Sequence, residues 1–330
     1  MLGIRRRELI ALIGGVAAWP LAGRAQQGER MRRRIGVLMN LAADDKEGQA
    51  RLIAFVQALS DLGWNTSNVQ IDSCWGAGDR NRMNQCAVEL VALGPEVILA
   101  ASASTMDPLL NQTSSIPIVF AQVPDPVGSG YVKSLARPGG IVTGFTQFDF
   151  SIAGRWLGLL KMIEPSLARV IVFRDVDTTG TGQFGAIQSA AQLIGIEVSP
   201  AGVRDVGDIE SAVMDFARFP KGGVVVTGSA PAAVHRNLII ALADRHRLPS
   251  IYPFRYFAHS GGLLSYGPTT IEPYKGAAGY VDRILKGEKP ANLPVQASTK
   301  YELVINMKTA KTLGLDVPPT LLAIADELIE

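Results

Sequence analysis

Short aliphatic runs alternate with longer amphipathic segments along most of this chain. The aliphatic runs contain almost no polar position, which is typical of strands buried on both faces of a parallel sheet. The longer segments repeat apolar residues at helical spacing and stop at glycine or proline, as at Gly63 and at Gly94-Pro95. In the first part of the chain this pattern predicts strands at 35–39, 69–73, 97–101, 118–120 and 141–145, with helices at 49–62, 79–93 and 105–112.

The same alternation restarts after residue 150 and predicts a second α/β unit of similar size. Its predicted strands lie at 170–173, 197–200, 223–227 and 249–252, and its helices at 151–163, 184–193, 209–219 and 232–246. Beyond Gly261-Gly262 the pattern predicts a strand to Tyr266, a helix at 274–285, a Gly/Pro-rich connector at 287–294 and a strand at 301–306 with a short helix. Two such units and a tail that can cross between them predict two lobes joined by several chain segments.

The first 25 residues have the three parts of a secretory signal peptide. The basic start Arg5-Arg6-Arg7 precedes an apolar run at 9–22, and Gly23 and Ala25 are the small residues before a cut after Ala25. That run of 14 residues is shorter than the roughly 20 that span a bilayer, so a retained membrane anchor is the less favoured alternative. We therefore expect a periplasmic protein, exported by the general route or, given Arg6-Arg7, by the twin-arginine route.

Removal of this segment changes the charge balance of the chain. Residues 1–25 carry four arginines and one glutamate, so the formal net charge of +2 for the whole chain becomes −1 for the mature protein. A nearly neutral body argues against a nucleic-acid-binding surface.

Cys74 and Cys86 are the two cysteines of the chain. In an oxidising compartment they can form a disulfide. One ends a predicted strand and the other lies in a predicted helix, which favours two separate thiols. The spacings of a zinc site are absent, and we expect neither a metal nor a cofactor.

Small hydroxyl residues follow two of the predicted strands, at the edge where parallel α/β sheets bind ligands. Ser102, Ser104 and Thr105 follow the strand at 97–101 and open a helix. Their hydroxyl and N–H groups can hold a carboxylate or another anion, and ordinary N-capping is an equally good interpretation. Thr227-Gly228-Ser229 repeats the same strand–hydroxyl–helix arrangement in the second unit.

Charged and aromatic residues supply further candidates near the same edge. Asp125 can cap the turn that follows it or face the cleft. Arg174 and Arg255 can grip a carboxylate through paired N–H donors, or they can form surface or inter-lobe ion pairs. Five aromatic residues can line the cleft or pack in the core: Trp75, Phe148, Phe184, Tyr252 and Phe254.

The sequence lacks a catalytic arrangement. His235, His246 and His259 have neither HExxH spacing nor a partner pattern, and GxSxG is missing. The glycines at 180 and 182 do not complete a phosphate-binding loop. Hydroxyls, amides and aromatics without a coupled acid, base or nucleophile favour a binding protein over an enzyme.

Several segments together carry a resemblance to a known family. They are RRELI at 6–10, AWPL at 18–21, IPIVF at 116–120, VPDPVG at 123–128, SLARPGG at 134–140, GFT at 144–146, ALADRHRLP at 241–249, SYG at 265–267, ILKGEKP at 284–290 and KYELVIN at 300–306. With them the chain resembles, essentially end to end, the exported ABC-transporter substrate-binding proteins, a family that includes the TrpX-like tryptophan-binding proteins.

The resemblance implies an α/β fold of the type I periplasmic-binding class, with two Rossmann-like lobes of parallel sheet around a cleft. The first lobe would comprise residues 34–145 and a return at about 268–294. The second would comprise 149–267 and about 299–330. The three hinge segments would lie near 145–150, 266–268 and 290–294, and the lobes would close on the ligand about them.

The resemblance also implies a function and a ligand site. The family's ligand-lining loops correspond here to Ser102, Ser104, Asp125, Thr146, Asp175, Thr227, Ser229 and Tyr266. We expect the periplasmic receptor of an ABC importer, a monomer that delivers a small molecule to an inner-membrane permease. An amino acid is the expected ligand, with aromatic amino acids among the candidates, and its ammonium group would lie on an aspartate such as Asp125 or Asp175. A receptor for aromatic or aliphatic carboxylates and the ligand-binding subunit of a membrane sensor are the alternatives.

Overall fold

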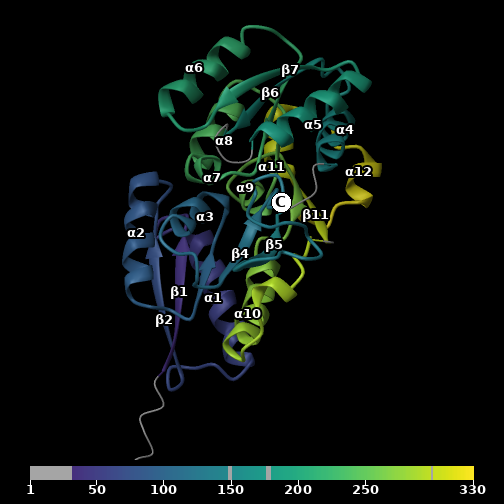
Figure 1. The fold of residues 1–330 in the computed structure, drawn as a ribbon. Helices are drawn as coiled ribbons and strands as arrows, with labels where there is room; N and C mark the ends of the chain where they lie inside the picture. Colours follow the sequence, from purple (N-terminus) through teal and green to yellow (C-terminus); the bar gives the residue numbers. More distant parts are fainter. Residues whose placement is uncertain (1–31, 148–150, 176–179, 299) are drawn as a thin grey trace, which may run out of the picture.

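Two β-sheets covered by helices make up the protein (Figure 1). The computed structural model describes residues 32–147, 151–175, 180–298 and 300–330. We call the five-stranded sheet with α1, α2, α3 and α10 the first unit, and the seven-stranded sheet with its own helices the second unit. Figure 1 shows the first unit in purple and blue except for α10, which is yellow-green and comes from far along the chain.

The first unit contains a wholly parallel sheet in the order β2-β1-β3-β4-β5. Its strands are β1 (Arg33–Met39), β2 (Val69–Trp75), β3 (Val97–Ala100), β4 (Ile118–Val123) and β5 (Val142–Thr146). Its helices are α1 (Lys46–Asp61), α2 (Arg80–Ala92), α3 (Ala103–Leu110) and α10 (Glu272–Leu285). The predicted elements of this region are present, with ends that move by one to three residues.

Alternation along β1 shows why this sheet needs helices on both faces. Ile35, Val37 and Met39 belong to a core cluster with residues of α1 and α10. Leu38, between them, belongs to a second cluster with residues of α2 and α3. Successive side chains of a strand point to opposite faces, so a strand that is apolar at every position requires cover on each side.

The second unit contains a sheet in the order β12-β11-β10-β9-β8-β6-β7. Its strands are β6 (Arg169–Arg174), β7 (Glu197–Gly202), β8 (Gly222–Val226), β9 (Ser250–Tyr252), β10 (Leu264–Pro268), β11 (Tyr301–Asn306) and β12 (Glu327–Ile329). Its helices are α4 (Ile152–Ile163), α5 (Gly180–Leu193), α6 (Val206–Phe216), α7 (Ala230–Val234), α8 (Arg236–Arg245), α9 (Arg255–His259), α11 (Met307–Leu313) and α12 (Pro319–Ala323). One extended apolar cluster contains residues from all of these elements except β12.

Three features of the second unit differ from the sequence-based expectation. β10 and β11 pair antiparallel, because β11 enters this sheet directly from the first unit without a crossover helix. The predicted helix at 232–246 is two helices, and His235 is the shared cap between them. The short elements α9, α12 and β12 were not predicted, since each has at most five residues and too little periodicity to detect.

The chain passes between the two units three times. It leaves β5 for α4, and it later returns from β10 to α10, which packs against α1, β4 and β5. The third crossing is not at 290–294 as expected. Leu293 and Val295 are buried in the first unit, and the Gln296 carbonyl accepts a hydrogen bond from the Thr146 N–H at 2.8 Å. The crossing therefore follows Gln296, because this segment lies beside β5.

Within the described residues, every helix is too short or too polar to cross a lipid bilayer. The apolar run at 9–22, and with it the signal peptide expected at 1–25, lies outside those residues. The periplasmic location and the export route remain predictions from the sequence.

Cys74 and Cys86 form a disulfide, which corrects the sequence-based preference for two separate thiols. Cys74 is at the end of β2 and Cys86 is in the middle of α2. Because α2 packs back against β1 and β2, the strand end and the helix face meet, with 5.6 Å between the two Cα atoms. The pattern of the sequence does not show that contact.

Removal of this disulfide should destabilise the protein. The bond closes a loop with a sequence separation of 12, and restricting the unfolded chain over such a loop contributes about 3 kcal/mol. We expect the double variant Cys74→Ser, Cys86→Ser to lose about that much free energy of unfolding in urea denaturation. The wild-type protein in reducing agent should behave alike, and equal stability of the oxidised and reduced forms would contradict the expectation.

Candidate functional site

Two neighbouring cavities lie between the first and second units. The smaller one, which we call the inner pocket, has a volume of about 30 Å³. Its walls are formed by Asn40, Arg51, Ser102, Ala103, Ser104, Gln122, Pro124, Gln147, Gly228, Ser229, Ala230, Ala233, Phe254 and Tyr256. Apart from Arg51 on α1, these residues lie at or beyond the carboxyl ends of β1, β3, β4, β5, β8 and β9. The inner pocket therefore lies where α/β sheets ordinarily bind ligands.

The larger one, the outer cavity, has a volume of about 770 Å³ and shares Ala103, Ser104 and Ala230 with the inner pocket. Its volume is within the range of small-molecule sites, roughly 300–1,000 Å³. It too has walls from both units. At its edge Gly78 of the first unit approaches Val234 of the second so closely that an added Cβ would meet Val234 Cγ2 at 2.9 Å.

The Ser102–Ser104 loop has the arrangement that its sequence suggests. Ser102 is the N-cap of α3, and its N–H donates to Thr105 Oγ1 at 3.3 Å, while Thr105 Oγ1 donates to the Ser102 carbonyl at 2.7 Å. The Ser102 and Ser104 hydroxyls are 2.8 Å apart, and both residues line the inner pocket. Capping and a position on the pocket wall thus occur together.

Ser229 has the equivalent position in the second unit. Its hydroxyl accepts a hydrogen bond from the Ala232 N–H at 3.3 Å and caps α7. Ser229 lines the inner pocket across from the first unit. Thr227, by contrast, is fully buried and donates its hydroxyl to the Phe173 carbonyl at 2.9 Å, so it is not part of either wall.

Three of the four remaining predicted site residues lie outside both cavities. Asp125 is exposed and caps a turn, accepting from the Gly128 N–H at 2.8 Å, and Thr146 is buried within β5. Tyr266 stacks on Tyr301. None of these three is among the residues lining the two cavities within the described part of the chain. Asp175 lines the outer cavity, where Arg204 donates to its carboxylate at 2.8 Å.

The two arginines proposed to grip a carboxylate have other partners. Arg255 forms ion pairs with Glu302, at 3.2 Å, and with Glu327. Arg174 lies over the Phe184 ring, 4.4 Å from its centroid. Among the five candidate aromatics, Phe254 lines the inner pocket. Tyr252 and Phe184 are core residues, Trp75 packs against the first unit's core, and Phe148 lies outside the described residues.

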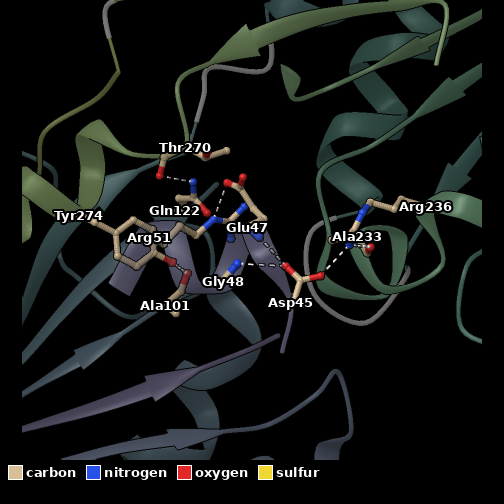
Figure 2. Close-up of polar contacts among 10 residues, drawn as sticks. All are labelled: Asp45, Glu47, Gly48, Arg51, Ala101, Gln122, Ala233, Arg236, Thr270 and Tyr274. Carbon is tan, nitrogen blue, oxygen red and sulfur yellow. Dashed lines mark hydrogen bonds and ion pairs between the residues drawn. The ribbon is translucent and has the colours of Figure 1, made fainter. Parts of the chain in front are cut away.

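Arg51 is a pocket residue that sequence analysis missed. Its side chain is only 3% exposed, and its Nε donates to Glu47 Oε1 at 2.9 Å (Figure 2). The guanidinium carbon is 5.8 Å from the Tyr256 ring centroid and 5.9 Å from that of Tyr274. Tyr274 in turn donates its hydroxyl to the Ala101 carbonyl at 2.9 Å. A glutamate four residues before an arginine is typical of an exposed helix face, so the sequence pattern does not predict that Arg51 is buried.

The surroundings of Arg51 keep it charged. Burial alone disfavours the cation, but Tyr274, Glu47 and Tyr256 stabilise it, so the pKa of Arg51 lies above its ordinary value. Burial raises the pKa of both Tyr256 and Tyr274, against the opposing effect of Arg51. The inner pocket therefore contains a permanent positive charge between two neutral phenols.

Two amides on the pocket wall were also missed. Asn40 directly follows β1 and is 4% exposed, and among the described residues its Oδ1 has no hydrogen-bond partner. A buried acceptor without a partner is costly, which marks it as a place for a ligand donor. Gln122, with φ of +61°, interrupts the register between β4 and β5 and donates from Nε2 to the Thr270 carbonyl at 3.1 Å (Figure 2).

An ion pair beside the inner pocket connects the two units. Arg236 Nη1 of α8 is 2.8 Å from Asp45 Oδ2, and the two side chains are 18% and 12% exposed (Figure 2). Asp45 Oδ1 simultaneously accepts from the Glu47 and Gly48 N–H groups and caps α1. Arg236 also lies 5.8 Å from the centroid of the Tyr256 ring. Asp45 therefore caps α1, the helix that carries Arg51, and also pairs with Arg236 of the second unit.

Comparison with known proteins gives the family. Residues 41–329 match the family described as ABC transporter substrate binding protein, and the chain belongs to this family. It is 25% identical over 269 residues to the tyrosine-binding protein of Clostridioides difficile, covering 79% of this chain and 75% of that one. The chain is thus a substrate-binding component of transport rather than an enzyme.

Solved structures agree with the fold. The ABC domain of Streptococcus pneumoniae in complex with L-Trp has a TM-score of 0.84 at 23% identity, over 90% of this chain and 100% of that one. A conserved domain protein of Vibrio cholerae also has a TM-score of 0.84, at 25% identity, over 90% and 99% of the two chains. The ligand-free, open structure of an adhesive substrate-binding protein from Clostridium difficile has a TM-score of 0.66 at 22% identity, with coverage of 90% and 99%.

The two roles of Asp45 can be separated by substitution. Asp45→Asn keeps an oxygen that can cap α1 but removes the charge that pairs with Arg236, whereas Asp45→Ala removes both. Because an N-cap contributes about 1 kcal/mol, we expect Asp45→Ala to unfold at lower urea concentration than Asp45→Asn, with about that additional loss of stability. Equal stability of the two variants would show that the cap is not made.

Proposed function

We propose that this protein binds an α-amino acid between its two units and delivers it to the permease of an ABC importer. The observation that carries this proposal is the donor and acceptor set of the inner pocket. The hydroxyls of Ser102, Ser104 and Ser229 can donate to a carboxylate. The unpartnered Oδ1 of Asn40 can accept from an ammonium group.

This assignment replaces the ammonium partners expected from the sequence. Asp125 is committed to capping a turn, and Asp175 is committed to Arg204. Asn40 lines the same inner pocket as Ser102, Ser104 and Ser229, so an amino acid head group can contact both kinds of group.

Volume supports a division of the ligand between the two cavities. The inner pocket, at about 30 Å³, accommodates only a small group, because a water molecule alone needs roughly 10–15 Å³ on this scale. The side chain of the amino acid would extend past Ser104 into the outer cavity of about 770 Å³. Apolar walls such as Met83, Pro108 and Pro231, with the hydroxyl of Tyr131 beside them, suit an aromatic side chain.

The relatives support an aromatic ligand. One is named a tyrosine-binding protein, and another was solved with L-Trp. Both cavities have walls from the two units, which supports closure of the two lobes about the three crossings as the binding event. A ligand held by both units stabilises the closed arrangement by its contacts with each of them.

The ligand assignment can be tested with L-tryptophan and L-tyrosine. At 100 times its dissociation constant, a ligand stabilises the native protein by about 2.7 kcal/mol, so the bound amino acid should raise the melting temperature in a thermal-shift measurement. Sugars and amines serve as comparison compounds. If neither amino acid nor any other compound shifts the transition, the proposed function is wrong.

The ammonium site can be tested with Asn40→Leu, which keeps the side-chain volume but removes the acceptor. We expect at least a 10-fold loss of affinity by isothermal titration calorimetry, because an ammonium group would be left without an acceptor. Asp125→Ala is the matched control and should bind as the wild type does. The reverse result, with Asp125→Ala impaired and Asn40→Leu intact, would restore the assignment made from the sequence.

A further inference from the structure

We infer that Arg51 is the residue that binds the carboxylate of the ligand, and hence that the ligands of this protein are carboxylates rather than neutral solutes. The inference rests on the proposed function, which requires a carboxylate but supplies only hydroxyls for it. Arg51 lines the same inner pocket as Ser102 and Ser104. Arg51 and these serines therefore border the same small space of about 30 Å³.

The guanidinium of Arg51 has more donors than its neighbours in the protein use. A guanidinium has five N–H donors in a planar fork that matches the two oxygens of a carboxylate. Here the bond to Glu47 uses Nε. In the described part of the chain, Glu47 is the one carboxylate within ion-pair distance of Arg51. The side chains of Tyr256 and Tyr274 also hydrogen-bond Arg51, which leaves at least two of its five N–H groups for the carboxylate of a ligand.

The position of Arg51 is fixed before any ligand binds. Glu47 holds Nε, as Figure 2 shows, and the rings of Tyr256 and Tyr274 lie at 5.8 and 5.9 Å from the guanidinium carbon. A preorganised donor loses little side-chain entropy on binding, which favours affinity. An arginine needed only to join α1 to its neighbours would not require a place on the wall of a ligand pocket.

The charges of the site select among carboxylates. Arg51 and Glu47 together are neutral, so a bare carboxylate adds one uncompensated negative charge to a buried site. An α-amino acid brings its own ammonium group, for which the Oδ1 of Asn40 is an acceptor. We therefore expect zwitterionic amino acids to bind more tightly than the corresponding acids without an amine.

The test compares an acid with its amide in two arginine variants. L-Tryptophan and L-tryptophanamide are titrated into the mature protein, Arg51→Gln and Arg236→Gln by isothermal titration calorimetry. We expect Arg51→Gln to bind L-tryptophan about 10- to 100-fold more weakly and to lose the preference for the acid over the amide. Arg236→Gln is the matched control, because Arg236 also lies over Tyr256 but does not line the pocket. It should weaken both compounds equally and keep the preference.

A purely structural role of Arg51 predicts a different result. Loss of packing would lower the affinity for acid and amide alike, so an unchanged preference in Arg51→Gln overturns the inference while leaving amino acid binding intact. Should Arg51→Gln fail to fold by circular dichroism, Arg51→Lys keeps the charge and removes the fork. Its preference for the acid should fall, and an unchanged preference there overturns the inference as well. If wild-type protein binds neither compound, the proposed function and this inference both fail.

Discussion

The packing of α10 against the first sheet is the contact on which the rest of the molecule depends. Tyr274, Ala277, Ala278 and Val281 of this helix are fully buried and cover the face that α1 alone leaves open. Each large apolar side chain buried in this way contributes about 1.5–3 kcal/mol. Because α10 comes from a distant part of the sequence, its docking also forces the chain to cross between the units before and after it.

The same helix places the charge of the site. Tyr274, near the start of α10, lies against Arg51 and donates to the Ala101 carbonyl at the end of β3. Tyr256 contributes the other aromatic neighbour, from the second unit. Arg51 thus contacts Tyr274, a core residue of the first unit, and Tyr256 of the second unit. A substitution at Arg51 would therefore change contacts in the core and between the units.

Much of the fold could be predicted from the sequence, and part of the site could. Runs such as β3, apolar at every position, identify buried parallel strands, and the hydroxyls after β3 and β8 predicted Ser102, Ser104 and Ser229 on the pocket wall. Asn40 and Arg51 could not be predicted in the same way. A single amide after a strand carries no pattern, and Arg51 with Glu47 looks like an exposed helix pair. Arg51 is buried beside Tyr256 and Tyr274, which are more than 200 residues away in sequence, so only the folded chain brings these groups together.

The disulfide between Cys74 and Cys86 affects the outer cavity as well as the stability of β2 and α2. The helix that it holds supplies Arg80, Met83 and Asn84 to the wall of the outer cavity. One wall of the outer cavity is thus anchored by a covalent bond that forms under oxidising conditions. The redox state of the compartment therefore determines how this cavity wall is held. In protein prepared in a reducing cytoplasm, packing alone would hold it.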